Sequence, residues 1–204
     1  MNGEEIQALY LGCHNMLYMD GDISNYEFYS KRDKQSTHQI IGQDNDKNLL
    51  VIEPKSITVP LYVFRSTGEF VAEMEFQVRR VPKPTLAVRT NGQVLIDTKQ
   101  NHLSREDTIF IQLSVEEYFS SVAPADTTYQ PGKMRFSFWH SDLSIKVEPI
   151  STGKGLWKIP IKEYINQRDT TEVSLIIYDL ERVDRDGKAS GICGGMSFHM
   201  FIAP

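Results

Sequence analysis

A run of strict alternation in the middle of the chain constrains the fold more than any other feature. From Phe70 to Val78, apolar or small side chains occupy every second position, and Arg80 falls at the next position of this series; mostly charged or polar side chains lie between them. A period of two predicts a half-buried β-strand rather than a helix. The preceding segment, Ser56–Phe64, is rich in β-branched and aromatic residues, and Gly68 follows it. The two runs therefore predict a β-hairpin that turns at Arg65–Gly68.

Strand signals also dominate the rest of the chain. Short apolar runs separated by polar turn clusters predict upstream strands at Ile6–Leu11, Met16–Met19, Tyr26–Tyr29, His38–Ile41 and Leu49–Ile52. Downstream strands are predicted at Leu86–Arg89, Gln93–Ile96, Thr108–Leu113, Met134–Trp139, Leu143–Val147, Glu172–Asp179 and Met196–Ile202. Asn91-Gly92 predicts a tight hairpin turn, because both central positions of such a turn need positive φ. One short helix is predicted at Ile159–Gln167, where the apolar residues form a single stripe.

Two prolines interrupt the strand pattern directly after the first predicted hairpin. They hold the chain extended and cannot donate to a strand ladder. We therefore predict an interdomain linker, which consists of Val81, Pro82, Lys83 and Pro84. The predicted fold is mostly β: residues 1–82 form an Ig-like β-sandwich, and residues 85–204 form a second small β domain with one short helix.

The composition excludes several classes of function. Hydrophobic residues make up 40% of the chain and charged residues 24%, as in ordinary folded proteins. A net charge of −5 gives no general attraction for nucleic acid, so no nucleic-acid partner is expected. No stretch approaches the roughly 18–20 apolar residues of a membrane span. Met1–Gln7 is polar and acidic, unlike a signal peptide. We expect either a cytoplasmic protein or a soluble piece of a longer exported chain.

A search for catalytic and metal-binding patterns finds none that is complete. The histidines lack the spacing of a metal site; they are His14, His38, His102, His140 and His199. The acidic clusters at residues 20–22, 44–46 and 184–187 are more typical of turns than of calcium loops. Gly191–Gly195 lacks the Lys-Ser/Thr of a phosphate loop. We therefore predict no enzyme activity, no metal and no cofactor. An enzyme would need distant residues to converge, such as His102, His140 and Asp142.

Three further features each have two interpretations. Cys13 and Cys193 are either buried thiols or a long-range disulfide, which would need an oxidising compartment. The basic residues Arg79, Arg80, Lys83 and Arg89 indicate a solvated strand edge or interdomain contact rather than a nucleic-acid surface. The large aromatic side chains of the second half either pack in a core or form a platform for a carbohydrate; they are Trp139, Trp157, Tyr164 and Tyr178.

Several segments also carry a family resemblance. Phe76–Pro84 reads Phe-Gln-Val-Arg-Arg-Val-Pro-Lys-Pro, and Leu9–Leu17 reads Leu-Tyr-Leu-Gly-Cys-His-Asn-Met-Leu. These segments are similar to the F-x-V-K/R-R-I/V-P-x-P and L-Y-V-G-x-x-N-P-I patterns of the gliding-motility family GldM, called PorM in related secretion systems. Val173–Lys188, followed by Ser197–Ile202, resembles the closing strand, D-G-K turn and strand of that family. Met16 stands where the family has proline.

The resemblance implies a periplasmic or cell-envelope location, with the membrane anchor outside this chain. It implies dimers built from series of β domains, without catalytic residues, in the gliding and type IX secretion complexes of Bacteroidetes. The implied partners are outer-membrane-side secretion or motility components. We therefore expect a non-catalytic structural and protein-interaction module. The alternative is a carbohydrate- or ligand-binding β module on the cell surface.

Overall fold

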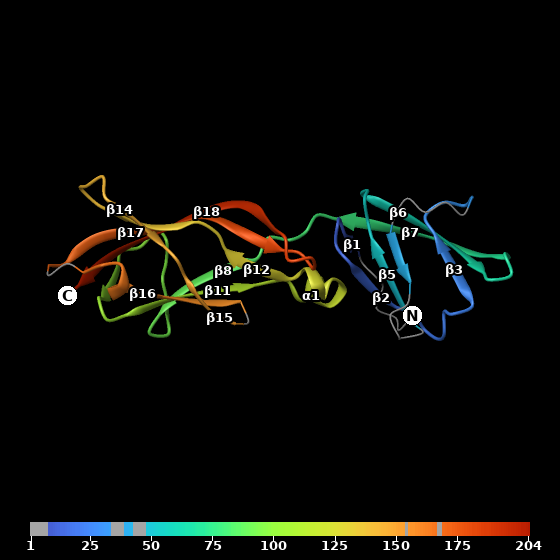
Figure 1. Cartoon of the computed structure of the whole chain (residues 1–204), viewed down its shortest axis with the longest axis horizontal. Helices are drawn as coiled ribbons and strands as arrows, with labels where there is room; N and C mark the ends of the chain where they lie inside the picture. Colours follow the sequence, from blue (N-terminus) through green and yellow to red (C-terminus); the bar gives the residue numbers. More distant parts are fainter. Residues whose placement is uncertain (1–7, 34–38, 43–47, 154, 167–168) are drawn as a thin grey trace. The chain divides into compact units, whose positions relative to one another are not determined.

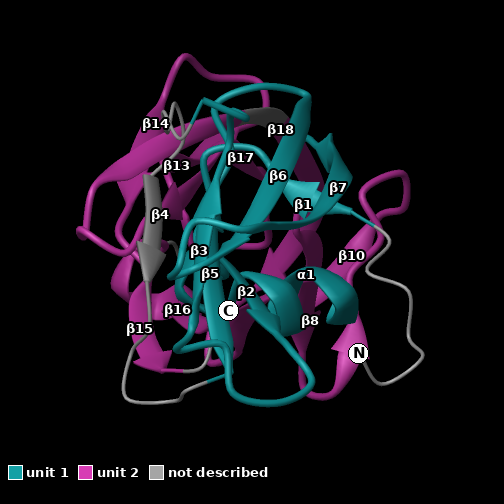
Figure 2. Cartoon of the chain, turned by 90° about the vertical axis from the view of Figure 1, so that its right-hand side faces the viewer, with its two compact units in different colours: residues 1–82, 116–127 teal, residues 83–115, 128–204 magenta. Residues whose placement is uncertain are grey.

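The computed structural model describes residues 8–33, 39–42, 48–153, 155–166 and 169–204. The chain forms two compact units, coloured separately in Figure 2. The first unit comprises Met1–Pro82 and Glu116–Thr127, and the second comprises Lys83–Val115 and Thr128–Pro204. The predicted mostly β fold class is confirmed. The predicted ranges 1–82 and 85–204 were continuous, whereas the segment Glu116–Thr127 belongs to the first unit. The independent folding of each range stays a prediction.

The first unit contains a four-stranded sheet in the order β1-β7-β6-β3 and a three-stranded sheet in the order β2-β5-β4 (Figure 1). The strands are β1 (Leu9–Tyr10), β2 (Asn15–Tyr18), β3 (Tyr26–Tyr29), β4 (Gln39–Gly42), β5 (Leu49–Glu53), β6 (Thr58–Arg65) and β7 (Phe70–Arg79). Apolar residues from both sheets form one buried core, including Leu17, Ile52 and Leu61. β1 pairs in parallel with β7. This is the Ig-like sandwich that the sequence predicts.

The predicted hairpin of the first unit is formed by β6 and β7, which are antiparallel. Gly68 in its turn has φ +93°, a conformation that favours glycine. Pro60 lies beyond the β3–β6 ladder, which covers only Tyr62–Arg65 of β6. Among the described residues, no strand pairs with β6 on that side of Pro60, and such an edge position is one at which proline is tolerated.

The second unit has a sheet in the order β10-β18-β17-β13-β14, with β12 also paired to β17, and a five-stranded sheet in the order β15-β16-β11-β8-β9. The strands are β8 (Thr85–Thr90), β9 (Gln93–Val94), β10 (Asn101–Ser104), β11 (Thr108–Ser114), β12 (Thr128–Pro131), β13 (Met134–Phe138), β14 (Ser144–Val147), β15 (Ile150–Gly153), β16 (Leu156–Pro160), β17 (Thr171–Val183) and β18 (Ala189–Ala203). Both sheets contribute to one core, which includes Ile111, Phe136 and Leu175.

The two units repeat one strand scheme without a repeat in the sequence. In each unit, an early short strand pairs in parallel with the last strand, as β1 does with β7 and β10 with β18. In the other sheet of each unit, a strand lies between two strands that precede it in the sequence. In the first unit β5 lies between β2 and β4, and in the second unit β16 lies between β11 and β15. The second unit is therefore also a two-sheet sandwich. The sequence predicted a small β domain without specifying this architecture.

The α-helix lies elsewhere than predicted. It is α1 (Glu117–Val122), followed by the 3₁₀ turn η1 (Pro124–Asp126), and both belong to the first unit. The predicted helix at Ile159–Gln167 is wrong, because β16 stays paired with β11 as far as Pro160. In the described part of this range, β16 is followed by the 3₁₀ turn η2 (Ile161–Glu163). The apolar stripe was still informative, since Ile161 and Ile165 are both buried. No helix in the described part of the chain is long and apolar enough to span a membrane.

Residues Val81, Pro82, Lys83 and Pro84 lie between β7 and β8 and have no strand pairing. The first of the boundaries between the two compact units along the chain falls within this segment, between Pro82 and Lys83. Its role as an interdomain linker stays a prediction.

Candidate interaction surface

One face of the β10-β18-β17-β13-β14 sheet lies opposite the core of the second unit, and we call it the outer face. Side chains of a strand alternate between the two faces. In β17, Val173, Leu175 and Ile177 enter the core, and the intervening residues belong to the outer face. By strand register, the outer face carries Glu172, Ser174, Ile176 and Tyr178 of β17, His199 and Phe201 of β18, His102 of β10, Arg135 and Ser137 of β13, and Ser144 and Lys146 of β14.

A chain of polar contacts crosses three neighbouring segments of the outer face, and we call it the Trp139 relay. Trp139 Nε1 donates a hydrogen bond to Ser174 Oγ at 3.0 Å, and Ser174 Oγ lies 3.5 Å from His199 Nδ1. His199 Nε2 lies 3.1 Å from Glu172 Oε1. Because a carboxylate only accepts, His199 Nε2 carries the proton that it donates to Glu172, while the Ser174 hydroxyl oxygen accepts from Trp139 Nε1. Each member of the relay therefore fixes the orientation of the next.

Aromatic rings extend the Trp139 relay along the face. The His199 ring meets the rings of Trp139 and Phe201 edge-on, with centroids 4.7 and 5.4 Å away. Phe201 in turn stacks on His102 at 5.2 Å. Trp139 nevertheless remains 52% exposed. A tryptophan that is anchored by its N–H and exposes its ring is the kind of side chain found at protein interfaces.

A shallow depression lies on the same face, and we call it the basic hollow. It is lined by Lys133, Met134, Arg135, Ser144, Lys146 and Tyr178. Arg135 and Lys146 are directly opposite each other in the β13–β14 register. The Arg135 guanidinium lies over the Tyr178 ring, 4.8 Å from its centroid. Lys146 Nζ donates to Glu148 Oε1 at 2.8 Å, and this hydrogen bond raises the pKa of the Lys146 ammonium.

The predicted aromatic platform does not form as a group of four. Trp157 and Tyr164 pack against the core of the second unit, and the Tyr164 ring lies 5.9 Å from that of Phe136. Trp139 and Tyr178 are exposed and lie at the outer face. His140 and Asp142, which an enzyme would have needed beside His102, are exposed in the turn after β13. Among the described residues, no group of three or more His, Cys, Asp or Glu side chains is placed to hold a metal ion.

The remaining sequence candidates have structural positions. Asp184 accepts hydrogen bonds from the backbone N–H groups of Asp186 and Lys188, so this acidic cluster forms the predicted turn. Gly195 lies within β18, where an added Cβ would come 3.2 Å from the carbonyl oxygen of Ile177. Cys13 is buried. The side chain of Cys193 lies outside the described residues, as do His38 and residues 44–46.

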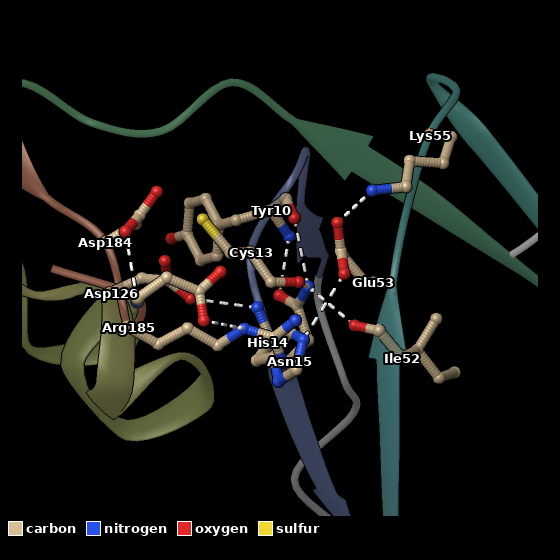
Figure 3. A network of polar contacts seen from close by, with 11 residues as sticks. Tyr10, Cys13, His14, Asn15, Ile52, Glu53, Lys55, Asp126, Asp184 and Arg185 are labelled. Carbon is tan, nitrogen blue, oxygen red and sulfur yellow. Dashed lines mark hydrogen bonds and ion pairs between the residues drawn. The ribbon is translucent and has the colours of Figure 1, made fainter. Parts of the chain in front are cut away.

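The opening motif of the first unit is built around one buried amide, shown in Figure 3. The Asn15 side chain accepts a hydrogen bond from Tyr10 N at 2.7 Å. It also donates to the carbonyl oxygens of Tyr10, Cys13 and Ile52. Gly12 provides the positive φ, +65°, that the turn requires. These residues hold β1 against the start of β2, so the motif has a structural role.

Sequence reasoning missed the Trp139 relay and the basic hollow. Glu172 and Ser174 lie two positions apart, but His199 comes from another strand and Trp139 from a turn. Their meeting depends on cross-strand register, which no local pattern in the sequence encodes. His199 is opposite Ser174 in the β17–β18 register, and this pairing places it on the outer face.

The relay makes a testable prediction about the mobility of the indole. We expect Ser174→Ala to release the Trp139 N–H and to lower unfolding free energy by about 1 kcal/mol, the usual net worth of a hydrogen bond. Fluorescence anisotropy decay of Trp139, recorded in a Trp157→Phe background, should show faster local motion. Ser137→Ala on the same face is the matched control and should change neither quantity. Unchanged indole motion in Ser174→Ala would contradict the anchoring role.

Comparisons with known proteins do not assign this chain to a family. No protein-family profile matches it, and no curated protein sequence matches it. Among solved structures, it is similar to a chimeric titin Z1Z2 carrying an exogenous peptide from decorin, with 9% identity, 97% of this chain and 92% of that chain covered, and a TM-score of 0.37. It is also similar to the N-terminal Ig1-2 module of the Drosophila receptor protein tyrosine phosphatase DLAR, with 13% identity, 97% and 93% coverage, and a TM-score of 0.23.

A third likeness is to the Bacteroides ovatus glucan-utilisation protein SGBP-B, which was solved in complex with a mixed-linkage heptasaccharide. Here the identity is 7%, the coverage is 97% of this chain and 44% of that chain, and the TM-score is 0.26. All three likenesses are too distant to indicate what this chain binds. The assignment of the fold rests on the strand order and the two cores described above.

Proposed function

We propose that this chain is a non-catalytic structural and protein-interaction module of a bacterial cell envelope, and that the outer face of its second unit binds a partner protein. The observation that carries the proposal is the half-exposed Trp139 held by the relay. Tryptophan is enriched among the few residues that dominate binding energy at interfaces. A side chain that is already fixed loses little conformational freedom on binding, so more of its contact energy contributes to affinity.

We further propose that the module corresponds to the periplasmic end of a GldM-like gliding-motility or type IX secretion protein, with an outer-membrane-side partner. This rests on the sequence resemblance. The residues that carry the resemblance have roles that a shared fold requires: Asn15 holds the opening motif, and Gly187 supplies a φ of +77° in the closing turn.

The test is affinity capture from the separated envelope and cytoplasmic fractions of the source bacterium. We expect the chain to retain an envelope protein directly, and Trp139→Ala to weaken its binding at least tenfold, as truncation of a dominant interface residue does. Trp157→Phe is the matched control, since Trp157 packs against the core. Equal retention by Trp139→Ala and the unchanged chain, with both correctly folded by circular dichroism, would argue against this surface. Retention of cytoplasmic proteins alone would argue against the envelope assignment.

A carbohydrate-binding module is the second candidate, and one observation favours it. Trp139 and Tyr178 are 52% and 37% exposed and both lie at the outer face. Exposed aromatic rings can stack on sugar rings. A glycan array probed with the unchanged chain and with Trp139→Ala and Tyr178→Ala would distinguish the two. Saturable glycan binding that either variant abolishes, without a retained protein partner, would select this candidate.

A further inference from the structure

Strand β14 lies at one end of its sheet, beyond β13. Phe138 N bonds to Leu143 O, and bonded and non-bonded pairs alternate along an antiparallel ladder. Ser144 and Lys146 therefore turn their backbone N–H and C=O groups away from β13. Among the described residues, β13 is the strand with which β14 pairs. An edge of this kind is a template for an added strand.

The charges beside this edge are unusual for a chain with a net charge of −5. Three of the six residues that line the basic hollow are cations, and none of these six is acidic. Like charges directly opposite in a sheet are destabilising, yet Arg135 faces Lys146 across the β13–β14 pair. The Lys146–Glu148 ion pair offsets little of this, because its side chains are 76% and 74% exposed. Arg135 gains its contact with the Tyr178 ring, but the facing Arg135 and Lys146 still leave positive charge at this edge.

We propose that the β14 edge and the basic hollow together bind an acidic, extended segment of a partner polypeptide, which pairs with β14 as an added strand. Alternate side chains of such a strand lie on the outer face, beside Ser144 and Lys146. A carboxylate opposite Lys146 would come within ion-pair reach of it, and a neighbouring carboxylate would reach toward Arg135. The inference rests on the proposed function, because it names the class of partner and the place on the same face where it binds.

The edge lysine also explains selectivity. A lysine on an edge strand discourages pairing with neutral or basic strands. Lys146 also favours a strand that brings a carboxylate opposite it, so charge discriminates between acidic partners and neutral or basic ones. The exposed Leu143 directly precedes β14 and offers an apolar contact to such a segment. Charge, backbone polarity and this apolar contact therefore all match an acidic strand.

The test uses the full chain and a fluorescein-labelled peptide of eight residues that alternates glutamate with threonine. We expect saturable binding in fluorescence anisotropy, weakened at least tenfold by Arg135→Glu or Lys146→Glu. The same peptide with glutamine in place of glutamate should bind at least tenfold more weakly. A glutamate peptide methylated on all of its backbone nitrogens keeps its charge but cannot donate hydrogen bonds to β14, and it should also lose binding. Lys188→Glu, at an exposed turn of the second unit, is the matched charge control.

Several outcomes would overturn the proposal. Equal binding of the methylated and unmethylated peptides would show that charge alone is recognised, without an added strand. Tighter binding of a single-stranded oligonucleotide than of the peptide would point to a different anion. Capture of a Trp139-dependent partner by the full chain, without binding of the peptide, would reject this inference and leave the proposed function standing.

Discussion

Replacing Phe119 with alanine is expected to lower the unfolding free energy of the first unit by about 3–5 kcal/mol, the usual cost of truncating a buried phenylalanine. Phe119 is fully buried, and its ring meets the Tyr10 ring edge-on at a centroid distance of 4.6 Å. The neighbouring Tyr118 hydroxyl donates to Ala8 O at 2.9 Å and accepts from Ala8 N at 3.1 Å. Through these contacts, the helix fixes the start of β1.

Urea unfolding followed by circular dichroism would measure the effect of Phe119→Ala. Ser121→Ala, at an exposed position of the same helix, is the matched control and should stay within about 0.5 kcal/mol of the unchanged chain. Tyr10→Phe keeps the ring contact and removes a buried hydroxyl that has no hydrogen-bond partner within the described residues. That variant should be neutral or more stable by about 1 kcal/mol. A loss below about 1 kcal/mol in Phe119→Ala would mean that the helix contributes little to the first unit.

The Asn15→Ala substitution is expected to lower the unfolding free energy by a similar amount, about 3–5 kcal/mol, for a different reason. It would leave the Tyr10 N–H without the amide oxygen that accepts from it. It would also remove the amide N–H from three carbonyl oxygens, of which Tyr10 O keeps a hydrogen bond from Cys13 N. Each buried polar group without a partner costs about 1–3 kcal/mol. Relaxation of the turn around Gly12 would recover part of this summed free-energy cost.

Asn15→Asp sharpens the test, because it is nearly the same size as asparagine. Aspartate keeps an oxygen that can accept from Tyr10 N, but it turns a second oxygen toward three carbonyl groups. We expect it to be at least as destabilising as Asn15→Ala at neutral pH. Asn25→Ala in an exposed turn is the control and should shift the urea midpoint little. Equal midpoint shifts in Asn15→Ala and Asn25→Ala would show that the buried amide is not the source of stability.

Much of the local structure could be predicted from the sequence, because local chemistry decides it. Alternation from Phe70 to Arg80 predicted β7 almost to its ends. Asn91 and Gly92 both have positive φ, +46° and +79°, as their turn type requires. The Asp184–Lys188 cluster formed a turn because an aspartate side chain can bond to backbone N–H groups just ahead of it. In each of these cases, the residues that specify the structure lie within a few positions of one another.

Only the tertiary structure decided the location of the helix and the composition of the outer face. The stripe of Ile161 and Ile165 has helical spacing, but pairing of β16 with β11 uses the preceding backbone for a sheet. The helix formed instead at Glu117–Val122, where Phe119 is buried against Tyr10. Glu172, Ser174 and His199 met through the β17–β18 register. Periodicity and turn chemistry thus determined the strands and turns, whereas long-range pairing decided which side chains share a surface, because register depends on contacts between distant segments.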